Sequence, residues 1–540
     1  MFKTTHSLLA EALTGPVVLA GDPGWDDARA GFNLLLDQHP AAVAFPAHAD
    51  DVATAVAYAR AAGLRVAPQA TAHNQGPLGG LEDTLLLNVS ALQQVQVDPG
   101  ARRVRVGAGV KWDRVAPRLS AHGLAGLHGS SPDVGIAGYS LGGGMGWLAR
   151  KHGLQCNAVT AFELVTADGE LVRADTDNHP DLFWALRGGG GNFGVVTAIE
   201  FAVHEVEDLY AGALFFPFER SAEVLHTWSA LLGTFPDELM SWASVMHFPP
   251  IPDVPAFARG RSYAVVMAAH LGTEADGREL LRPLRALRPE RDTFAAVPPV
   301  VLGDLAMDPL DPVPFRLTHQ LLDELPANAI DELMAKVGPG SGRGPTVTIL
   351  QFRHMGGALA RVLPDAGARA TLPGEVCGMA LGVVVDEASD AAVRHALADF
   401  DVVMRPHRAG LYPNFVEEPA DASGFFAPAV WERLRAVKTD YDPVDLFAGN
   451  HHVPPAVPSR AVSVPVLPFL DGKEIRIGET VSAVASRLGR AAESGRQEID
   501  RGSLGERLTR FYEYAGARFI LVFEPFERNG EVRIAAIYLP

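Results

Sequence analysis

Two glycine-rich segments constrain this chain most, because each matches a catalytic motif while its neighbours contradict the match. Residues 189–194 read GGGNFG, which fits the GxGxxG fingerprint of a dinucleotide-binding turn. That fingerprint requires a helix directly after it, so that the helix N-terminus meets the pyrophosphate. Residues 195–201, VVTAIEF, are mostly β-branched or apolar and predict a strand. The context therefore argues against a Rossmann-type turn.

Residues 138–142, GYSLG, match the nucleophile elbow of serine hydrolases, with Ser140 as the nucleophile. An elbow needs a strand that enters a sharp turn, whereas the preceding residues include Pro132 and Gly135. A serine hydrolase stays open as an alternative of another functional class. The six glycines between residues 135 and 146 indicate a surface that a flat or anionic ligand approaches closely, because no side chain shields a glycine N–H group.

Length and charge limit the class of protein. A chain of 540 residues suits two or three domains, and no apolar run reaches the ~20 residues that span a bilayer. The net charge of -18 argues against nucleic-acid partners and anionic membranes. Cys156 and Cys377 support neither a disulfide framework nor a metal site. Without a signal-type N-terminal segment, the sequence predicts a cytoplasmic protein, and its Ala, Gly, Val and Arg content is typical of bacteria.

The distribution of short apolar runs predicts an α+β protein. Strands and helices alternate over the first two hundred residues, where Asp50 or Asp51 caps a helix that ends at Gly63. Strand-like and helix-like runs then predict a large sheet covered by helices, which forms a separate domain on the substrate side. A proline-rich stretch follows near residue 460 and is typical of a linker.

Six segments carry a family signature when they are taken together and in order. They are residues 41–59, 69–74 (QATAHN), 129–151, 181–194 (DLFWALRGGGGNFG), 412–414 (YPN) and 441–455. Their order resembles the FAD-linked oxidoreductases that include berberine bridge enzyme, aclacinomycin oxidoreductase and 6-hydroxynicotine oxidase. The resemblance covers residues 20–456 and implies a two-part FAD-binding domain of the PCMH type, a substrate domain with an antiparallel sheet covered by helices, and a small C-terminal α+β appendage.

The resemblance and the composition together set the expected domain boundaries. They are residues 1–206 for the FAD-binding domain (core about 36–206), 207–405 for the substrate-binding domain, 406–456 for a segment that returns to the FAD-binding domain, 457–470 for the linker, and 471–540 for the appendage. The appendage lies outside the resemblance. Its aromatic residues predict either a core of its own or a surface for homo-oligomer formation.

The resemblance implies a covalent cofactor. In this family the histidine of the pyrophosphate loop is bonded to the flavin 8α-methyl carbon, and His73 holds that place. Many relatives add a second bond from a cysteine that precedes a proline, but here Ser131 precedes Pro132 and predicts a single link. Where the family has Arg-Gly-Gly-Gly-His-Ser, this chain departs at Gln69, Ala70 and Ala72. The cofactor-binding residues implied are Gln69, Ala70, Thr71, Ala72, His73, Asn74, Ser131, Pro132, Gly135, Gly138, Gly142, Gly143, Gly194, Val196, Asn414 and Asn450.

The resemblance also implies catalytic residues. Tyr412 matches the tyrosine of a Tyr-x-Asn motif and is the expected base, and Asn414 would hold the flavin or that tyrosine. Gln351 and Arg353 alternate along a predicted strand, so they share one face and His354 lies on the other. Tyr139 is a further and weaker candidate.

The activity implied is that of an FAD-dependent oxidase. Such an enzyme transfers a hydride from an alcohol or amine carbon of a sugar or secondary metabolite to flavin N5, and O2 reoxidises the flavin. A flavin dehydrogenase with another electron acceptor and a protein that keeps FAD only for stability or binding are the alternatives within the same fold. The expected partners are a small-molecule substrate and O2.

Overall fold

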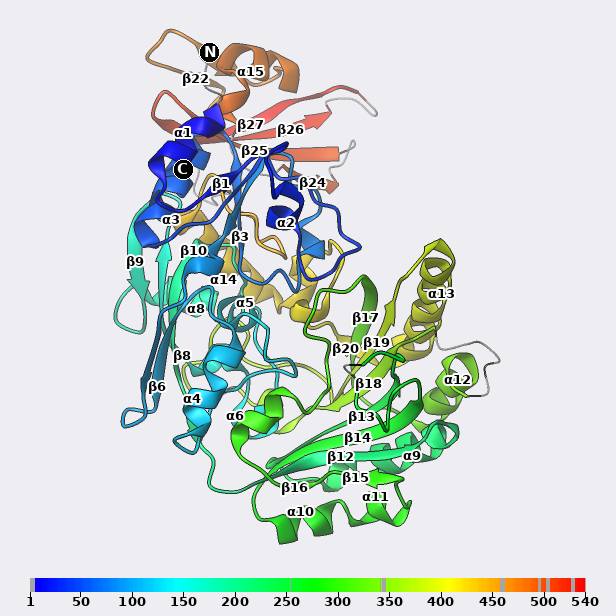
Figure 1. Ribbon diagram of the computed structural model, residues 1–540. Helices are drawn as coiled ribbons and strands as arrows, with labels where there is room; N and C mark the ends of the chain where they lie inside the picture. Colours follow the sequence, from blue (N-terminus) through cyan, green and yellow to red (C-terminus); the bar gives the residue numbers. More distant parts are fainter. Residues whose placement is uncertain are drawn as a thin grey trace.

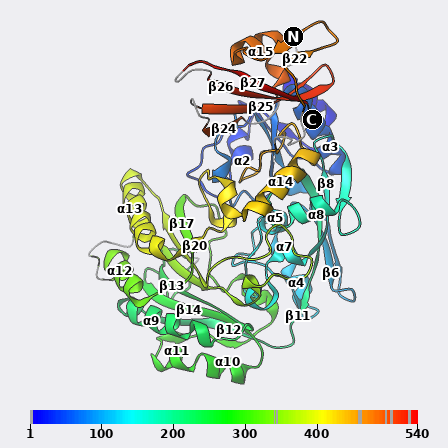
Figure 2. The same cartoon turned by 180° about the vertical axis from the view of Figure 1, so that it is seen from behind.

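The computed structural model describes residues 5–252, 254–339, 341, 346–456, 462–493, 497–501, 506–525 and 530–539. The N-terminal unit lies in the middle of the molecule, with a large sheet at one end and the C-terminal unit at the other (Figure 1). The view from behind shows the same order of the three units (Figure 2). None of the described helices has the length and apolar character needed to cross a membrane.

The N-terminal unit contains two main sheets with a helix between them. The smaller sheet has the spatial order β1 (Val17–Val18), β2 (Ala42–Ala44), β4 (Thr84–Asn88) and β3 (Arg65–Gln69), with β2, β4 and β3 parallel. The larger one is antiparallel and has the order β5 (Val95–Asp98), β6 (Arg103–Gly107), β10 (Val195–Ala202), β8 (Val159–Val165) and β9 (Leu171–Ala174). Helix α3 (Ala49–Ala62) contacts strands of both sheets, and Val52, Ala55, Val56 and Ala59 on it are fully buried. Since residues 195–202 form β10, the strand predicted after the glycine fingerprint is confirmed.

The N-terminal cap of α3 differs from the prediction. His48 is the cap residue, and its ring accepts from the backbone N–H of Asp51. The Asp51 carboxylate instead accepts from the backbone N–H groups of Thr14, Gly15 and Ala47, which fasten the N-terminal segment. Gly63 ends the helix as predicted, because the left-handed conformation there (φ 69°) suits a residue without a Cβ.

The large sheet at one end of the molecule is antiparallel throughout, as predicted. Its spatial order is β15 (Arg291–Asp292), β12 (Leu209–Pro217), β14 (Ser262–Leu271), β13 (Leu239–His247), β18 (Ile349–His354), β19 (Val376–Val383), β17 (Phe315–Leu322) and β20 (Arg408–Gly410). Helices α9 (Ser221–Leu231), α12 (Ala327–Val337) and α13 (Glu387–Met404) pack on one face of the sheet through a shared apolar core (Figure 1). On the opposite face, β12, β13 and β14 pack through a second apolar core on Trp147 and Leu148 of the N-terminal unit, and β17, β18 and β19 line the cavity described below.

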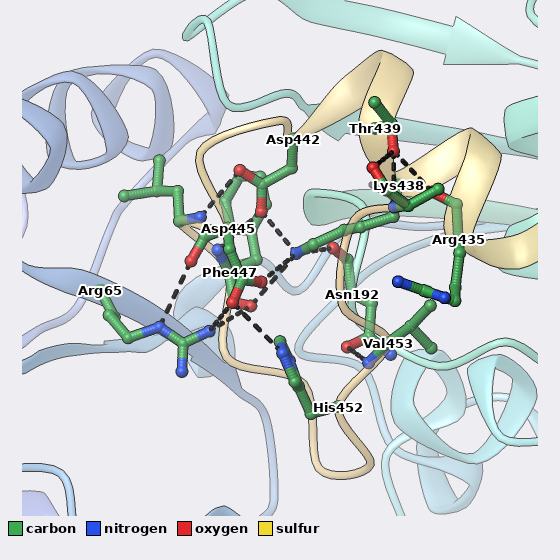
Figure 3. Close-up of polar contacts among 12 residues, drawn as sticks. Arg65, Asn192, Arg435, Lys438, Thr439, Asp442, Asp445, Phe447, His452 and Val453 are labelled. Atoms are coloured by element: carbon green, nitrogen blue, oxygen red, sulfur yellow. Dashed lines mark hydrogen bonds and ion pairs between the residues drawn. The ribbon is translucent and has the colours of Figure 1, made fainter. Parts of the chain in front are cut away.

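The return segment, residues 411–456, leads from the edge strand β20 back to the N-terminal unit through helix α14 (Pro428–Tyr441). Lys438 on α14 is fully buried and pairs with Asp442 at 2.6 Å and Asp445 at 3.1 Å. Its ammonium also donates to the carbonyl of Asn192 at 2.8 Å, and the Arg65 guanidinium reaches the same turn from β3 (Figure 3). This Lys438 cluster therefore joins the return segment to both sheets of the N-terminal unit.

The C-terminal unit is an antiparallel sheet with one helix, α15 (Val481–Leu488). The strand order is β21 (Val462–Ser463), β27 (Val532–Leu539), β26 (Ala517–Pro525), β25 (Glu506–Tyr514) and β24 (Glu498–Arg501). Tyr512, Phe519 and Phe523 are buried in its own core, so these aromatic side chains build the unit rather than an exposed oligomer surface. Phe526 lies outside the described residues.

The beginning of the C-terminal unit differs from the predicted linker. Strand β21 and the hairpin of β22 (Val466–Pro468) with β23 (Glu474–Arg476) fall within or beside residues 457–470. Proline is tolerated in short edge strands, where a missing N–H group costs no ladder bond. The unit rests on the N-terminal unit through an ion network in which Arg60 contacts Asp168 and Glu513, each at 3.1 Å.

We predict that Lys438→Met lowers the free energy of unfolding by about 3–5 kcal/mol, because it leaves two buried carboxylates without their ammonium. Thermal unfolding of the holoprotein followed by circular dichroism measures the loss. Lys336→Met is the matched control, since Lys336 pairs with Asp399 at 3.2 Å but is about one-third exposed, and such pairs contribute below ~1 kcal/mol. Equal losses in both variants would contradict the structural role of the Lys438 cluster.

Candidate active site

One cavity of about 1440 Å³ lies between the N-terminal unit and the part of the large sheet formed by β17, β18 and β19. Its walls are the loop after β3, residues 129–142, residues 188–196, the return segment and strands β17, β18 and β19. Pockets for single small ligands are typically ~300–1,000 Å³. The volume is therefore sufficient for a large cofactor together with a second molecule.

The structure brings nearly all predicted site residues to this cavity. Those that line it are Gln69, Ala70, Thr71, Ala72, His73, Asn74, Ser131, Pro132, Gly135, Gly138, Tyr139, Gly142, Gly194, Val196, Gln351, Arg353, Tyr412, Asn414 and Asn450. Gly143 is the exception, because a Cβ there would meet Arg369 at 3.1 Å and Tyr412 at 3.4 Å. Gly143 thus packs behind the wall and permits the close approach of these two side chains.

His73 is held on three sides. Its ring stacks on Phe32 with centroids 4.0 Å apart, Nδ1 lies 2.9 Å from Thr71 Oγ1, and Nε2 lies 3.2 Å from Asp133 Oδ2. An ionised carboxylate only accepts hydrogen bonds, so Nε2 carries the ring hydrogen. The Thr71 hydroxyl accepts from Gly135 N at 3.2 Å and is free to donate to Nδ1. The lone pair of the imidazole is therefore on Nδ1.

Asp133 is shared by His73 and Ser131. The Ser131 hydroxyl donates to Asp133 Oδ1 in a short hydrogen bond. Burial raises the pKa of Asp133, but the hydrogen bonds from His73 and Ser131 outweigh it and hold the pKa below its ordinary value. The carboxylate is thus ionised beside His73 at neutral pH. Asp133 was missed by the sequence reasoning, although it directly follows Ser131 and Pro132.

The loop after β3 keeps its shape despite the alanines. Ala72 has φ 55°, a left-handed conformation that favours glycine and costs an L-residue ~1–2 kcal/mol. Asn74 donates to the carbonyls of Val416 (3.0 Å) and Asn414 (3.2 Å), and Asn450 donates to the Asn74 carbonyl. These amide side chains fasten the loop to the return segment, which compensates for the strain at Ala72.

The residues of this half of the cavity fit an FAD. Gly138 and Gly191 line the cavity, and a Cβ built on either would meet nothing within 4 Å, so backbone is open to a flat or anionic ligand there. Gln69 Oε1 and Gln75 Nε2 are buried beside the loop without a hydrogen-bond partner. A dinucleotide with a ring system would contact both the unpaired polar atoms and the exposed backbone.

Tyr412 lies 1% exposed at the bottom of the cavity. Its hydroxyl oxygen accepts from the backbone N–H groups of Gly144 (2.9 Å) and Met145 (3.1 Å) and from Asn414 Nδ2 (3.0 Å). Burial raises the pKa of Tyr412 above its ordinary value, and the two N–H groups oppose that rise. Three donors around one oxygen stabilise negative charge on it, as an oxyanion hole does.

Gln351 and Arg353 point into the cavity from β18, as the alternation predicted. Gln351 donates to Ser244 Oγ at 3.1 Å and accepts from Arg353 Nε at 2.7 Å. His354 lies on the other face, where its Nε2 is 2.7 Å from Arg150 Nη1. His354 is therefore not part of the cavity.

Tyr139 and Ser140 lie on the short helix α5 (Ile136–Leu141). The Tyr139 hydroxyl donates to the carbonyl of Leu127 at 2.9 Å, so only its ring faces the cavity. Ser140 is fully buried and donates to the carbonyl of Ile136 at 2.7 Å within that helix. A nucleophile must be exposed at the apex of a turn. The serine hydrolase alternative is therefore wrong.

Two ionisable residues of the cavity wall had no signal in the sequence. Arg369 comes from a loop before β19, stacks on Phe426 at 4.6 Å and is buried beside Tyr412. Glu417 is half-buried, and desolvation raises its pKa to about 8, so its carboxyl group is mostly neutral at neutral pH. Both reach the wall from segments without a motif, and only the tertiary fold places them there.

Comparison with known proteins agrees with this geometry. Residues 40–175 match the FAD binding domain family. (R)-6-hydroxynicotine oxidase of Paenarthrobacter nicotinovorans is 28% identical over 460 residues, which cover 82% of this chain and 97% of that enzyme. The structure of BBE-like 1 from Physcomitrella patens superposes with a TM-score of 0.72 at 20% identity, over 84% of this chain and 99% of that one.

A further solved structure concerns the cofactor link. Glucooligosaccharide oxidase from Acremonium strictum, described as carrying a 6-S-cysteinyl, 8α-N1-histidyl FAD, superposes with a TM-score of 0.71 at 23% identity, over 84% of this chain and all of that one. Likeness at this identity shows the fold alone. The FAD binding domain and relatives along four-fifths of its length show that this chain is an FAD-linked oxidoreductase, and the solved structures show that it has the fold of the berberine-bridge-enzyme-like proteins.

Proposed function

We propose that the protein is an oxidase that removes a hydride from an alcohol or amine carbon, with O2 as the electron acceptor. The observation that carries the proposal is a single cavity with His73 in its FAD half and Tyr412 under three N–H donors where the two units meet. Named relatives oxidise 6-hydroxynicotine and xylo- and glucooligosaccharides, which supports an oxidase. A cytoplasmic location, a role in secondary metabolism and a homo-oligomer stay predictions.

The residues that would hold the FAD are those of the first half of the cavity. Residues 69–75 would cradle the pyrophosphate with backbone N–H groups, and Gly138 and Gly191 would let the backbone approach the cofactor. When bound, the flavin supplies the acceptor for the hydride and passes the two electrons to O2. The protein's part is to hold the substrate carbon against it and to move the proton.

His73 is suited to form one covalent link. Its Nδ1 lone pair is the nucleophile, while Asp133 accepts the Nε2 hydrogen and stabilises the positive charge that develops on the ring. His73 would hold the flavin through an N–C bond from Nδ1 to the 8α-methyl carbon. Forming that bond would release one methyl proton to solvent and one electron pair, which O2 would accept. Ser131 has no thiolate for a second link, and its hydroxyl is engaged by Asp133.

Tyr412 is suited to take the proton of the substrate hydroxyl or amine. The N–H groups of Gly144 and Met145 stabilise the charge that develops on its oxygen. Asn414 keeps the ring in place, because its amide bridges the Tyr412 hydroxyl and the Tyr139 carbonyl at 3.1 Å. Since burial raises the pKa of Tyr412, its phenol is protonated at neutral pH, and it acts as the base only after losing that proton, which the N–H donors around its oxygen favour.

We predict that His73→Ala abolishes the covalent link and that Asp133→Asn slows its formation about tenfold or more, because the carboxylate no longer supports positive charge on the imidazole. The measurement is flavin fluorescence of the protein band on a denaturing gel, followed over time after FAD is added to apoprotein.

Asp181→Asn is the control, since Asp181 pairs with Arg433 on the exposed surface. It should link FAD as fast as the wild type. Full linkage in His73→Ala would remove His73 from this role, and an unchanged rate in Asp133→Asn would limit Asp133 to a packing role.

We predict that Tyr412→Phe slows flavin reduction by ~10²–10⁴-fold, the usual contribution of a positioned base, while flavin content stays unchanged. The assay is anaerobic bleaching of the flavin by whichever alcohol or amine reduces the wild type in a screen. A raised pKa means that Tyr412 is protonated at neutral pH and becomes a free base only as pH rises, so the wild-type rate should increase toward alkaline pH. An unchanged rate, or the same pH dependence in the variant, would remove Tyr412 as the base.

A further inference from the structure

We infer that the substrate is an organic anion whose carboxylate pairs with Arg353. The inference rests on the proposed oxidase and adds the chemical class of its substrate. Arg353 projects from β18 into the cavity, which also contains Tyr412, so an anion held by the guanidinium lies within the same chamber as the proposed base.

Arg353 is a rigid and deeply buried cation. The residue is 5% exposed, and its guanidinium lies over the rings of Trp242 (4.0 Å) and Phe415 (5.0 Å). Its Nε donates to Gln351 Oε1 at 2.7 Å, and Gln351 is itself held by Ser244. Two ring faces and one hydrogen bond fix the position of the head group before any ligand binds, and pre-organisation of this kind lowers the cost of binding.

The charge of Arg353 has no protein counter-ion. Within the part of the chain that the structure describes, no carboxylate lies within ion-pair distance of its guanidinium, although Asp308 on the nearby loop acts on it from further away. Nη2 has only the sulfur of Met379 at 3.8 Å. Burying a guanidinium without a partner is costly, so the fold retains a charge that a bound anion would neutralise.

The other buried arginines are used differently. Arg150 donates to the backbone carbonyls of Leu239, Phe235 and Met355 and lies 3.8 Å from Asp237, away from the cavity. Arg369 also lines the cavity, where it donates to the carbonyl of Phe425 while its Nε and Nη2 have no hydrogen-bond partner among the described residues, and Gly143 and Gly188 pack against its stem. Arg353 is the one of these three that projects into the cavity from a strand of the large sheet.

The strands beside Arg353 contribute apolar residues to the cavity wall, whereas Asp304, Asp308 and Asp311 line the cavity from the loop before β17. The cavity-lining residues of the neighbouring strands include Met246, Leu317, Ile349, Met379, Leu381 and Val383. At the mouth, Ile251 and Leu310 are 46% and 56% exposed. Largely apolar pockets with a few fixed polar groups bind molecules of matching pattern. The body of the substrate is therefore apolar or aromatic, which distinguishes it from a neutral oligosaccharide.

The test uses the flavin-loaded protein and two probes of equal shape, 2-naphthoate and 2-naphthamide, titrated by calorimetry. The wild type should bind the carboxylate at least about tenfold more tightly than the amide, since charge-assisted pairs are the stronger ones. Arg353→Gln should bring the ratio of the two dissociation constants close to one, and Arg353→Lys should keep part of the preference. The control Arg361→Gln should keep all of it, because Arg361 is 57% exposed and pairs with Asp237.

Equal affinities in the wild type, no binding of the carboxylate, or a preference that survives in Arg353→Gln would each overturn the inference. The flavin midpoint potential of the same variants is the second readout. If Arg353→Gln lowers the flavin midpoint potential but leaves the carboxylate preference unchanged, Arg353 acts on the flavin and the inference about the substrate is overturned. Flavin content separates the two proposals. Wild-type protein that binds no FAD would contradict the proposed oxidase. FAD-loaded wild-type protein that binds 2-naphthoate and 2-naphthamide equally well would contradict only the anionic substrate.

Discussion

The buried pairing of Lys438 with Asp442 and Asp445 is the interaction on which the site depends. It holds helix α14 and the turn after it against β3 and β10, and the return segment that it anchors also carries Tyr412, Asn414 and Asn450. A buried ion cluster contributes little net stability but strongly disfavours any arrangement that leaves a charge alone. The return segment therefore packs on the N-terminal unit in one arrangement. That arrangement places the Tyr412 hydroxyl where the backbone N–H groups of Gly144 and Met145 donate to it.

The cavity that results has opposite charges in its two halves. Asp133 is ionised beside His73 in the half that suits FAD, and the Arg353 guanidinium is held by aromatic rings in the half that belongs to the large sheet. Tyr412 lies where the two units meet. A strand carries Arg353, whereas loops carry His73 and Asp133, which are tied down by Thr71 and by the amides of Asn74 and Asn450. Rigid placement on strands or tied loops is what a site needs to act on one atom of a substrate.

How much of this could be predicted from the sequence depends on the range of the interactions. The strand 195–202, the shared face of Gln351 and Arg353, and the antiparallel sheet follow from local periodicity, and His73 and Tyr412 follow from motifs. The helix cap at His48 was missed because the Asp51 carboxylate accepts from the N–H groups of Thr14 and Gly15, which are distant in sequence. The start of the C-terminal unit was missed because Pro468 lies in the short edge strand β22 and Pro465 directly before it. Asp133, Arg369 and Glu417 have no local signal, since their roles arise only when separate segments meet.

The most direct test of the central claim is the visible spectrum of the purified wild-type protein before and after acid precipitation. A flavin spectrum that stays with the precipitated protein, with a peptide map that places the flavin on the peptide of His73, is the result that a single histidyl link predicts. Yellow colour released entirely into the supernatant would contradict the covalent link while leaving FAD in the cavity. A colourless protein that takes up no added FAD would contradict the account as a whole.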